Sequence, residues 1–123
     1  MSEFKVKEGI TRNIDVLGRI VIPIAWRKKY GISTGAKIGV ILRENEILLK
    51  YDSDGKLEKQ GIRIRRIDEL GRIVLPKDLR NILELEENDP LYMIQEKEHI
   101  ILIMKMKHNL FIVFFQNLFK FFC

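Results

Sequence analysis

The sequence predicts a mainly β protein made of two copies of one small unit, each with the order β-β-α-β-β. Three observations carry this prediction. Residues 12–23 recur almost unchanged as residues 65–76, an offset of 53 positions from Gly18 to Gly71. Within each copy, short runs rich in β-branched residues are separated by glycines and prolines, as expected for strands joined by tight turns. The polar stretch 53–61 lies between the copies and is typical of a linker.

The repeat continues beyond this stretch at the same offset, because Arg27 corresponds to Arg80 and Ile41 to Ile94. A unit of roughly fifty residues buries little core by itself, so we expect each copy to supply packing surface that the other lacks. We divide the chain into four parts, namely a first repeat (1–52), a linker (53–61), a second repeat (62–107) and a tail (108–123).

The first strand of the unit is expected at residues 9–15, which are rich in β-branched side chains. A tight connection follows, in which Gly18 is free to adopt a positive φ. Residues 20–22 are all apolar, which predicts a short strand buried on both faces. Arg12 breaks the alternation of the first strand, so either a bulge re-aims its side chain or that strand is covered on neither face.

A helix is expected at residues 24–30, because Pro23 ends the strand and suits the first turn of a helix. Gly31 is placed to end this helix. In the second copy, Leu79, Ile82 and Leu83 have the spacing of an apolar stripe that faces a core, and Arg80 points away from it.

The last part of each unit is expected to be a hairpin. In the first copy its strands are predicted at residues 37–42 and 46–51, on either side of a turn at Glu44 and Asn45. The matching strands of the second copy are predicted at residues 91–95 and 99–104.

The sequence holds no pattern that indicates catalysis, a cofactor or a metal site. His99 and His108 lack the spacing of a metal site or a nucleophile–base pair, and no glycine-rich phosphate loop occurs. Cys123 is the single cysteine, which excludes a disulfide or a cysteine zinc site within one chain. Residues 1–8 lack the apolar run of a signal peptide, so a reducing, cytoplasmic location is expected.

Basic residues recur at matched positions and point to a polyanionic partner. The chain has 22 Lys and Arg against 17 Asp and Glu, a net charge of +5. Guanidinium groups fork onto phosphates and onto the O6/N7 edge of guanine, and two arginine sets related by a pseudo-twofold axis would match duplex DNA. A purely local role is the alternative for Arg19 and Arg72, which stand near Asp15 and Asp68 and could brace their turns by ion pairs. The two roles are compatible.

Residues 9–24 and 27–32 resemble the AbrB family, also called the SpoVT–AbrB or swapped-hairpin family. The motif D-x-L-G-R-[IV]-V-[IL]-P occurs twice, and the resemblance covers residues 9–51 and 62–105. It implies a β-barrel of two interleaved copies, with DNA bound by basic residues of the first strands and the helix. Carried over by position, the implied DNA contacts are Arg12, Arg19, Arg27, Lys28, Arg65, Arg66, Arg72 and Arg80.

The second copy departs from the family pattern more than the first. Asn13, in the first copy, stands where members often carry a basic residue. In the second copy, Asn81 replaces the basic residue that corresponds to Lys28, and the acidic stretch 84–89 lowers the charge. The second repeat is therefore expected to bind DNA less well and to serve more as a structural partner.

The resemblance implies a DNA-binding transcriptional regulator, for which occluding a promoter, and hence repression, is the simplest mechanism. The alternative is a MazE-like antitoxin, which would bind its operator and also a toxin. The turn of the two-copy MraZ type usually carries Lys-Gly-Arg, whereas this chain carries Leu17 before Gly18. One chain closing its own barrel and two chains exchanging units both remain open, as does a homo-oligomer.

The tail is rich in phenylalanine, since six of the seven phenylalanines of the chain lie after His108. The apolar stretch 110–123 is shorter than the roughly twenty residues of a membrane-spanning helix, and it holds Gln, Asn and Lys. An oligomer or partner interface is the preferred interpretation. Antitoxin-like engagement of a protein partner comes second and a membrane anchor third, while a tail without a selected role stays open.

Overall fold

The computed structural model describes residues 9–104, so the phenylalanine-rich tail lies outside the described residues. The order β-β-α-β-β occurs twice, as predicted. The first repeat comprises β1 (Gly9–Asn13), β2 (Arg19–Val21), α1 (Ile24–Tyr30), β3 (Lys37–Arg43) and β4 (Glu46–Tyr51). After α2 (Lys56–Lys59), the second repeat comprises β5 (Arg63–Arg66), β6 (Arg72–Val74), α3 (Lys77–Ile82), β7 (Pro90–Gln95) and β8 (Ile100–Met104).

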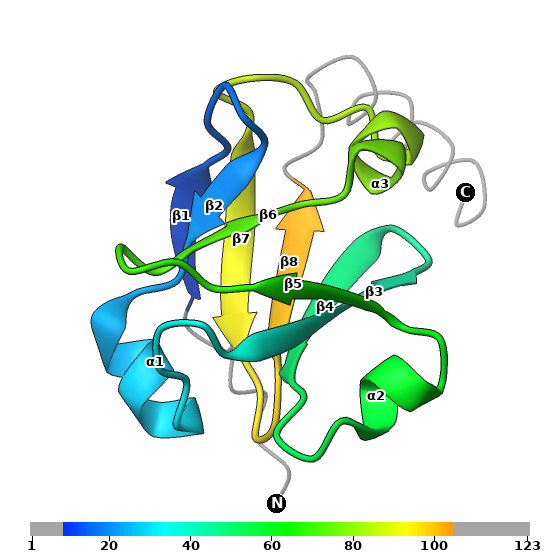
Figure 1. Ribbon diagram of the computed structural model, residues 1–123. Coiled ribbons are helices and arrows are strands. Elements are labelled where there is room, and N and C mark those ends of the chain that lie inside the picture. Colours follow the sequence, from blue (N-terminus) through cyan, green and yellow to red (C-terminus); the bar gives the residue numbers. More distant parts are fainter. Residues whose placement is uncertain (1–8, 105–123) are drawn as a thin grey trace, which may run out of the picture.

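The two repeats exchange their first strands (Figure 1). A six-stranded sheet has the order β1-β7-β8-β4-β3-β5, so β1 of the first repeat joins the hairpin of the second, and β5 joins the hairpin of the first. The two remaining strands, β2 and β6, pair with each other as a separate antiparallel ribbon. The swapped-hairpin arrangement therefore forms within a single chain. The closed barrel that the resemblance implies stays a prediction.

A single core forms between the repeats. Ile20 and Ile73, which face each other across the ribbon, are fully buried, as are Ile22 and Leu75 that follow them. They pack with inward side chains of both hairpins in one apolar cluster. The expectation that residues 20–22 are buried on both faces was wrong, because Val21 is 39% exposed. The core covers one face of the ribbon and leaves the other to solvent.

Helices α1 and α3, one in each repeat, agree with the sequence predictions to different degrees. Helix α1 has the predicted bounds, and Gly31 ends it with φ 69°. Helix α3 buries Leu79, and Leu83 directly after it is also buried, but Ile82 is 63% exposed. Ile82 was therefore placed wrongly in the apolar stripe. This short helix contacts the core along one line, and Ile82 lies to the side of that line.

The remaining expectations on the first strand and the hairpins can also be compared with the structure. The pairing of β1 with β7 is continuous from Gly9 to Asn13, and residues 11–13 are exposed. This excludes the bulge considered for Arg12 and shows that this end of the strand is covered on neither face. Both predicted hairpins are present, and the turn of the first contains Glu44 at φ 56°.

The stretch between the repeats is ordered around a buried carboxylate. Asp52, 5% exposed, accepts the backbone N–H groups of Leu57 and Glu58 at 3.0 and 3.2 Å, which fixes the start of α2. Leu57 then approaches Gly39 so closely that a Cβ there would lie 2.8 Å from its Cδ1. The expected linker thus includes one helical turn that packs on β3. Within residues 9–104, no helix has the length and apolar character needed to cross a membrane.

Candidate nucleic-acid interface

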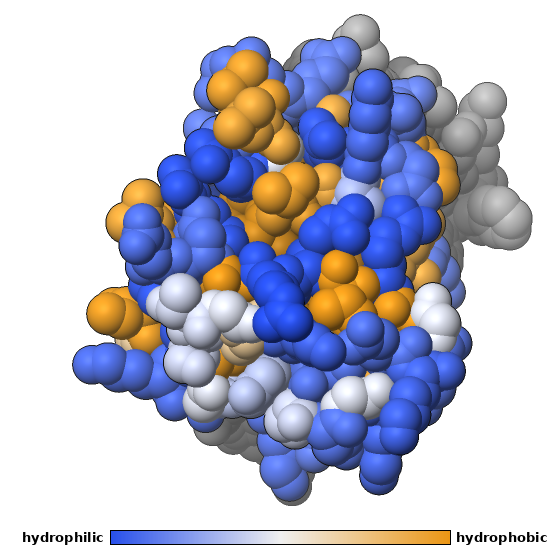
Figure 2. Space-filling model, in the orientation of Figure 1, coloured by the Kyte–Doolittle hydropathy of each residue, from blue (hydrophilic) through white to orange (hydrophobic). Residues whose placement is uncertain are grey.

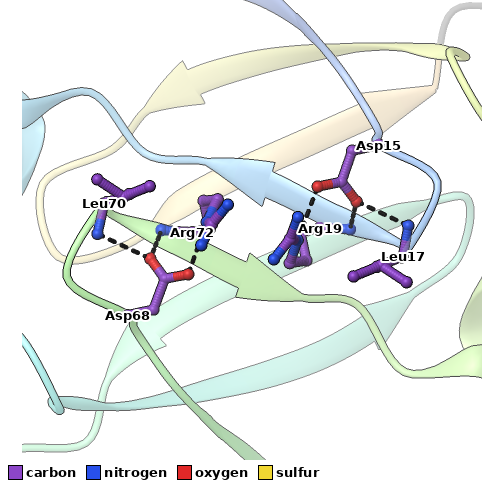
Figure 3. A network of polar contacts seen from close by, with 6 residues as sticks. All are labelled: Asp15, Leu17, Arg19, Asp68, Leu70 and Arg72. Carbon is purple, nitrogen blue, oxygen red and sulfur yellow. Dashed lines mark hydrogen bonds and ion pairs between the residues drawn. The ribbon is translucent and has the colours of Figure 1, made fainter.

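The turn that leads into β2 is held by one aspartate. Asp15 Oδ1 accepts the backbone N–H groups of Leu17 and Arg19, at 3.0 and 2.8 Å, while Oδ2 accepts Arg19 Nε at 2.7 Å (Figure 3). The carboxylate therefore closes the turn and orients the arginine in the same step. Gly18 adopts φ 78° in this turn, as the sequence predicts.

The turn before β6 repeats this geometry almost without change. Asp68 accepts the N–H groups of Leu70 and Arg72 at 3.0 and 2.8 Å, and Arg72 Nε at 2.6 Å (Figure 3). The local role considered for Arg19 and Arg72 is therefore confirmed. Each arginine meets its carboxylate through Nε and keeps about a quarter of its side chain exposed, 25% for Arg19 and 28% for Arg72. Bracing the turn is thus compatible with binding an anion.

The helix arginines lie against the turn of the opposite repeat. Arg80 donates from Nε to Leu75 O at 2.9 Å, and its guanidinium packs on Gly18, where a Cβ would lie 2.4 Å from Cζ. Arg27 makes the matching contacts with Ile22 O, at 3.0 Å, and with Gly71. Because β2 pairs with β6, Arg80 lies beside the turn that carries Arg19. In the same way, Arg27 lies beside the turn that carries Arg72. We call Arg19 with Arg80, and Arg72 with Arg27, the arginine pairs.

The other predicted contact residues make local contacts. Arg12 is exposed on β1 and donates to Thr11 O, while Arg65 is half-buried on β5 and donates to Ile64 O. Arg66 donates to Gly35 O at 2.9 Å, and Lys28 is exposed on α1. None of these contacts joins them to the arginine pairs.

Sequence analysis missed the apolar part of this surface. In the register of the ribbon, Arg19 faces Val74 and Val21 faces Arg72, so both valines share the outward side with the arginines. Leu17 and Leu70, each 59% exposed, stand in the two turns. Figure 2 shows apolar and strongly hydrophilic residues intermingled on this face. The two-residue spacing from Arg19 to Val21 would have placed them together, but only the fold shows that their side faces outward.

The two turn aspartates have lowered pKa values. At Asp15, partial burial raises the pKa. The hydrogen bonds from the backbone and side chain of Arg19, together with its positive charge, lower the pKa by more, so that it lies below 3.8. At Asp68, the hydrogen bond from the backbone of Arg72 is the largest cause, and the pKa is again below 3.8.

We expect these two carboxylates to contribute to acid sensitivity. A carboxylate whose pKa is lowered on folding stabilises the protein above its unfolded value, near 3.8, and this stability is lost as the pH falls through the lowered value. Thermal unfolding of Asp15→Asn/Asp68→Asn between pH 7 and pH 2 should give lower stability at pH 7 and a shallower acid decline. Glu69→Gln, in the second turn, controls for the loss of a charge. An unchanged acid decline in the double variant would contradict the expectation.

Gly18 is expected to tolerate alanine poorly for two separable reasons. A residue with a Cβ costs about 1–2 kcal/mol in the left-handed region, and the added Cβ would also displace the Arg80 guanidinium. Gly35 provides a matched control, because its φ is 84° but a Cβ there would meet nothing within 4 Å. Chemical denaturation should show Gly18→Ala to be more destabilised than Gly35→Ala. Equal losses would mean that the contact with Arg80 contributes nothing.

An interleaved pair of β-β-α-β-β repeats, with aspartate-braced turns and arginine pairs beside a central ribbon, defines a swapped-hairpin domain. A family model described as antidote-toxin recognition MazE, bacterial antitoxin, matches residues 16–56 and again residues 64–110, together more than half of the chain. The chain belongs to this MazE/AbrB-type family and contains two of its repeats. It therefore groups with antitoxins and regulators rather than with enzymes.

Two curated proteins of Bacillus subtilis (strain 168) are similar to parts of the chain. Stage V sporulation protein T is 40% identical over 42 residues, which cover 34% of this chain and 24% of that protein. The transition state regulatory protein AbrB is 45% identical over 54 residues, which cover 44% of this chain and 54% of that protein. The chain thus spans about half or less of the length of these relatives.

Among solved structures, the solution structure of PHS018 from Pyrococcus horikoshii is similar to the chain. It has a TM-score of 0.45 and 22% sequence identity. The match covers 85% of this chain and 100% of that one.

Proposed function

We propose that the protein is a transcriptional regulator that binds duplex DNA through the β2/β6 ribbon and the arginine pairs beside it. The carrying observation is the pairing of β2 with β6, which sets Arg80 beside the Arg19 turn and Arg27 beside the Arg72 turn. Guanidinium groups bind phosphate oxygens with paired, charge-assisted hydrogen bonds, and two clusters related by a pseudo-twofold axis suit the symmetry of a duplex. The similarity to a transition state regulatory protein supports the same conclusion.

The first repeat is expected to carry more of the phosphate binding. The last turn of α1 has three basic residues, Arg27, Lys28 and Lys29, whereas the last turn of α3 has one, Arg80. The first turn of α3 also contains an acidic residue, Asp78. The acidic residues of the stretch 84–89 follow α3 directly. We therefore propose unequal contributions to binding, in which Lys28 strengthens the binding by α1, α3 contributes less, and Arg65 and Arg66 add contacts from β5.

The simplest regulatory mechanism for such a protein is repression, because a small domain seated on a promoter excludes other proteins from it. Since duplex DNA is the proposed partner, we place the protein in the cytoplasm of a bacterial cell. A homo-oligomer would bring further ribbons to the same duplex and raise the affinity through multivalency.

Fluorescence anisotropy with a duplex across a salt series tests the proposal. Binding that weakens steeply with salt is expected, because each neutralised phosphate contributes about −0.9 to the slope of log K against log salt. Arg12→Ala/Arg65→Ala should flatten the slope, because we propose that these strand arginines also contact phosphates. Lys56→Ala/Lys59→Ala removes two charges from α2 and should leave the slope unchanged. A folded protein that does not bind at low salt would overturn the proposal.

An antitoxin is the second candidate, and the description of the matched family model favours it. In that case the protein would bind a toxin as well as its operator. Purification of the tagged full chain from its native host distinguishes the two functions. A stoichiometric partner that also lengthens the residence time on DNA would support the antitoxin, whereas recovery of the chain with DNA alone would favour the regulator.

A further inference from the structure

The outward face of the ribbon carries two valines in equivalent places. Ile20 and Ile73 fill the inward side with no exposed surface, so Val21 and Val74 point outward, and each is 39% exposed. Val21 lies across the ribbon from Arg72, and Val74 lies across from Arg19. An apolar side chain is thus set directly opposite each braced arginine.

These valines are not isolated apolar side chains on a mixed surface. Leu17 and Leu70 extend the same pattern into the turns, and the exposed fractions of each matched pair are equal. Single exposed apolar residues are common and carry no information, but four of them at symmetric positions, two on the ribbon and two in its turns, indicate a surface that meets an apolar group. This group must be small, because the arginines flank the valines.

Duplex DNA offers one apolar group of this size beside its polar base edges. The major groove admits a two-stranded β-ribbon, and among the four bases only thymine presents a methyl group there. We propose that Val21 and Val74 determine part of the specificity by contacting thymine 5-methyl groups while the neighbouring arginines hold phosphates or base edges. This inference rests on the proposed function, since it assigns a base contact to the same surface.

The ribbon also sets the spacing of the two contacts. In the antiparallel register, Val21 and Val74 are two residues apart along the ribbon axis, which corresponds to about 7 Å at roughly 3.4 Å per residue. Successive base pairs rise by about 3.4 Å, so the two methyl groups should lie roughly two base-pair steps apart, one toward each half-site.

Replacing thymine by uracil removes only the 5-methyl group and tests the contact. Anisotropy should be measured with a 30-base-pair duplex of alternating A and T and with the same duplex containing uracil. We expect the uracil duplex to bind about 4-fold more weakly for each contacted methyl group, or about 15-fold for two. Equal affinities would overturn the inference while leaving the proposed function intact, whereas no binding to either duplex at low salt would contradict both.

Variants separate a direct contact from an effect of uracil on the shape of the duplex. Val21→Ser/Val74→Ser should bind both duplexes equally and keep the salt dependence of the wild type, because the arginines remain. Val21→Thr/Val74→Thr retains β-branching and one methyl group, so it should fold and keep a smaller preference for thymine. Ile82→Ser removes an even more exposed apolar side chain, on α3 rather than on the ribbon, and should keep the full preference. A serine variant that folds and still prefers thymine would overturn the proposed contact.

Discussion

Replacing Arg19 and Arg72 together by alanine is expected to weaken binding to duplex DNA roughly 100-fold, since each charge-assisted hydrogen bond contributes about 1.5 kcal/mol or more. The slope of log K against log salt should become shallower by about two, because each arginine neutralises one phosphate. Both side chains are oriented by an aspartate and remain partly exposed, so they are held in place before the anion arrives. Anisotropy across a salt series measures both effects.

Two further variants show whether the effect belongs to these positions. Arg43→Ala removes an arginine that also forms an ion pair, with Glu46 at 2.7 Å, but at the tip of the first hairpin. It should change neither affinity nor slope. Arg19→Lys/Arg72→Lys keeps the charge and loses the planar fork, so it should recover the slope but only part of the affinity. Wild-type affinity in a folded Arg19→Ala/Arg72→Ala protein would exclude the ribbon as the binding surface.

Cutting the chain between the repeats is expected to leave the two halves bound to each other. A protease site inserted between Ser53 and Asp54, both exposed, would be cleaved without touching the buried Asp52. The pairs β1–β7, β3–β5 and β2–β6 all join one repeat to the other, and the cleaved protein should therefore elute as a one-to-one complex. The uncleaved insertion variant controls for the added residues.

Separation of the halves under denaturing conditions gives the larger effect. Each isolated repeat keeps its own hairpin but loses the partner of its first strand and half of the core. We expect no cooperative unfolding transition for either half alone, because the loss exceeds the roughly 5–15 kcal/mol by which domains are stable. Mixing the halves should restore the transition. An isolated repeat that folds as a monomer would show that the exchange is dispensable.

Several features of this protein follow from its sequence alone, because each depends on residues close together in the chain. Gly18, between Leu17 and Arg19, predicts a tight turn with a positive φ, and the turn forms as expected. Pro23 and Gly31 mark the two ends of α1, which has the predicted bounds. The repeat at a constant offset predicts two equal units with the same order of elements, and the resemblance carried by the motif predicts the family.

Other features depend on which distant segments meet, and only the tertiary structure decided them. Three consecutive apolar residues at 20–22 have no alternation that distinguishes a strand with one buried face from a strand with two, so the exposure of Val21 followed only from its place in the ribbon. Similarly, the spacing of Ile82 fits a helix stripe, but the short α3 meets the core along a narrower line. The contact of Arg80 with Gly18 joins residues 62 positions apart in the chain and arises from the pairing of β2 with β6. Local patterns specify the elements of this protein, whereas burial and long-range pairing determine which side chains form its surface.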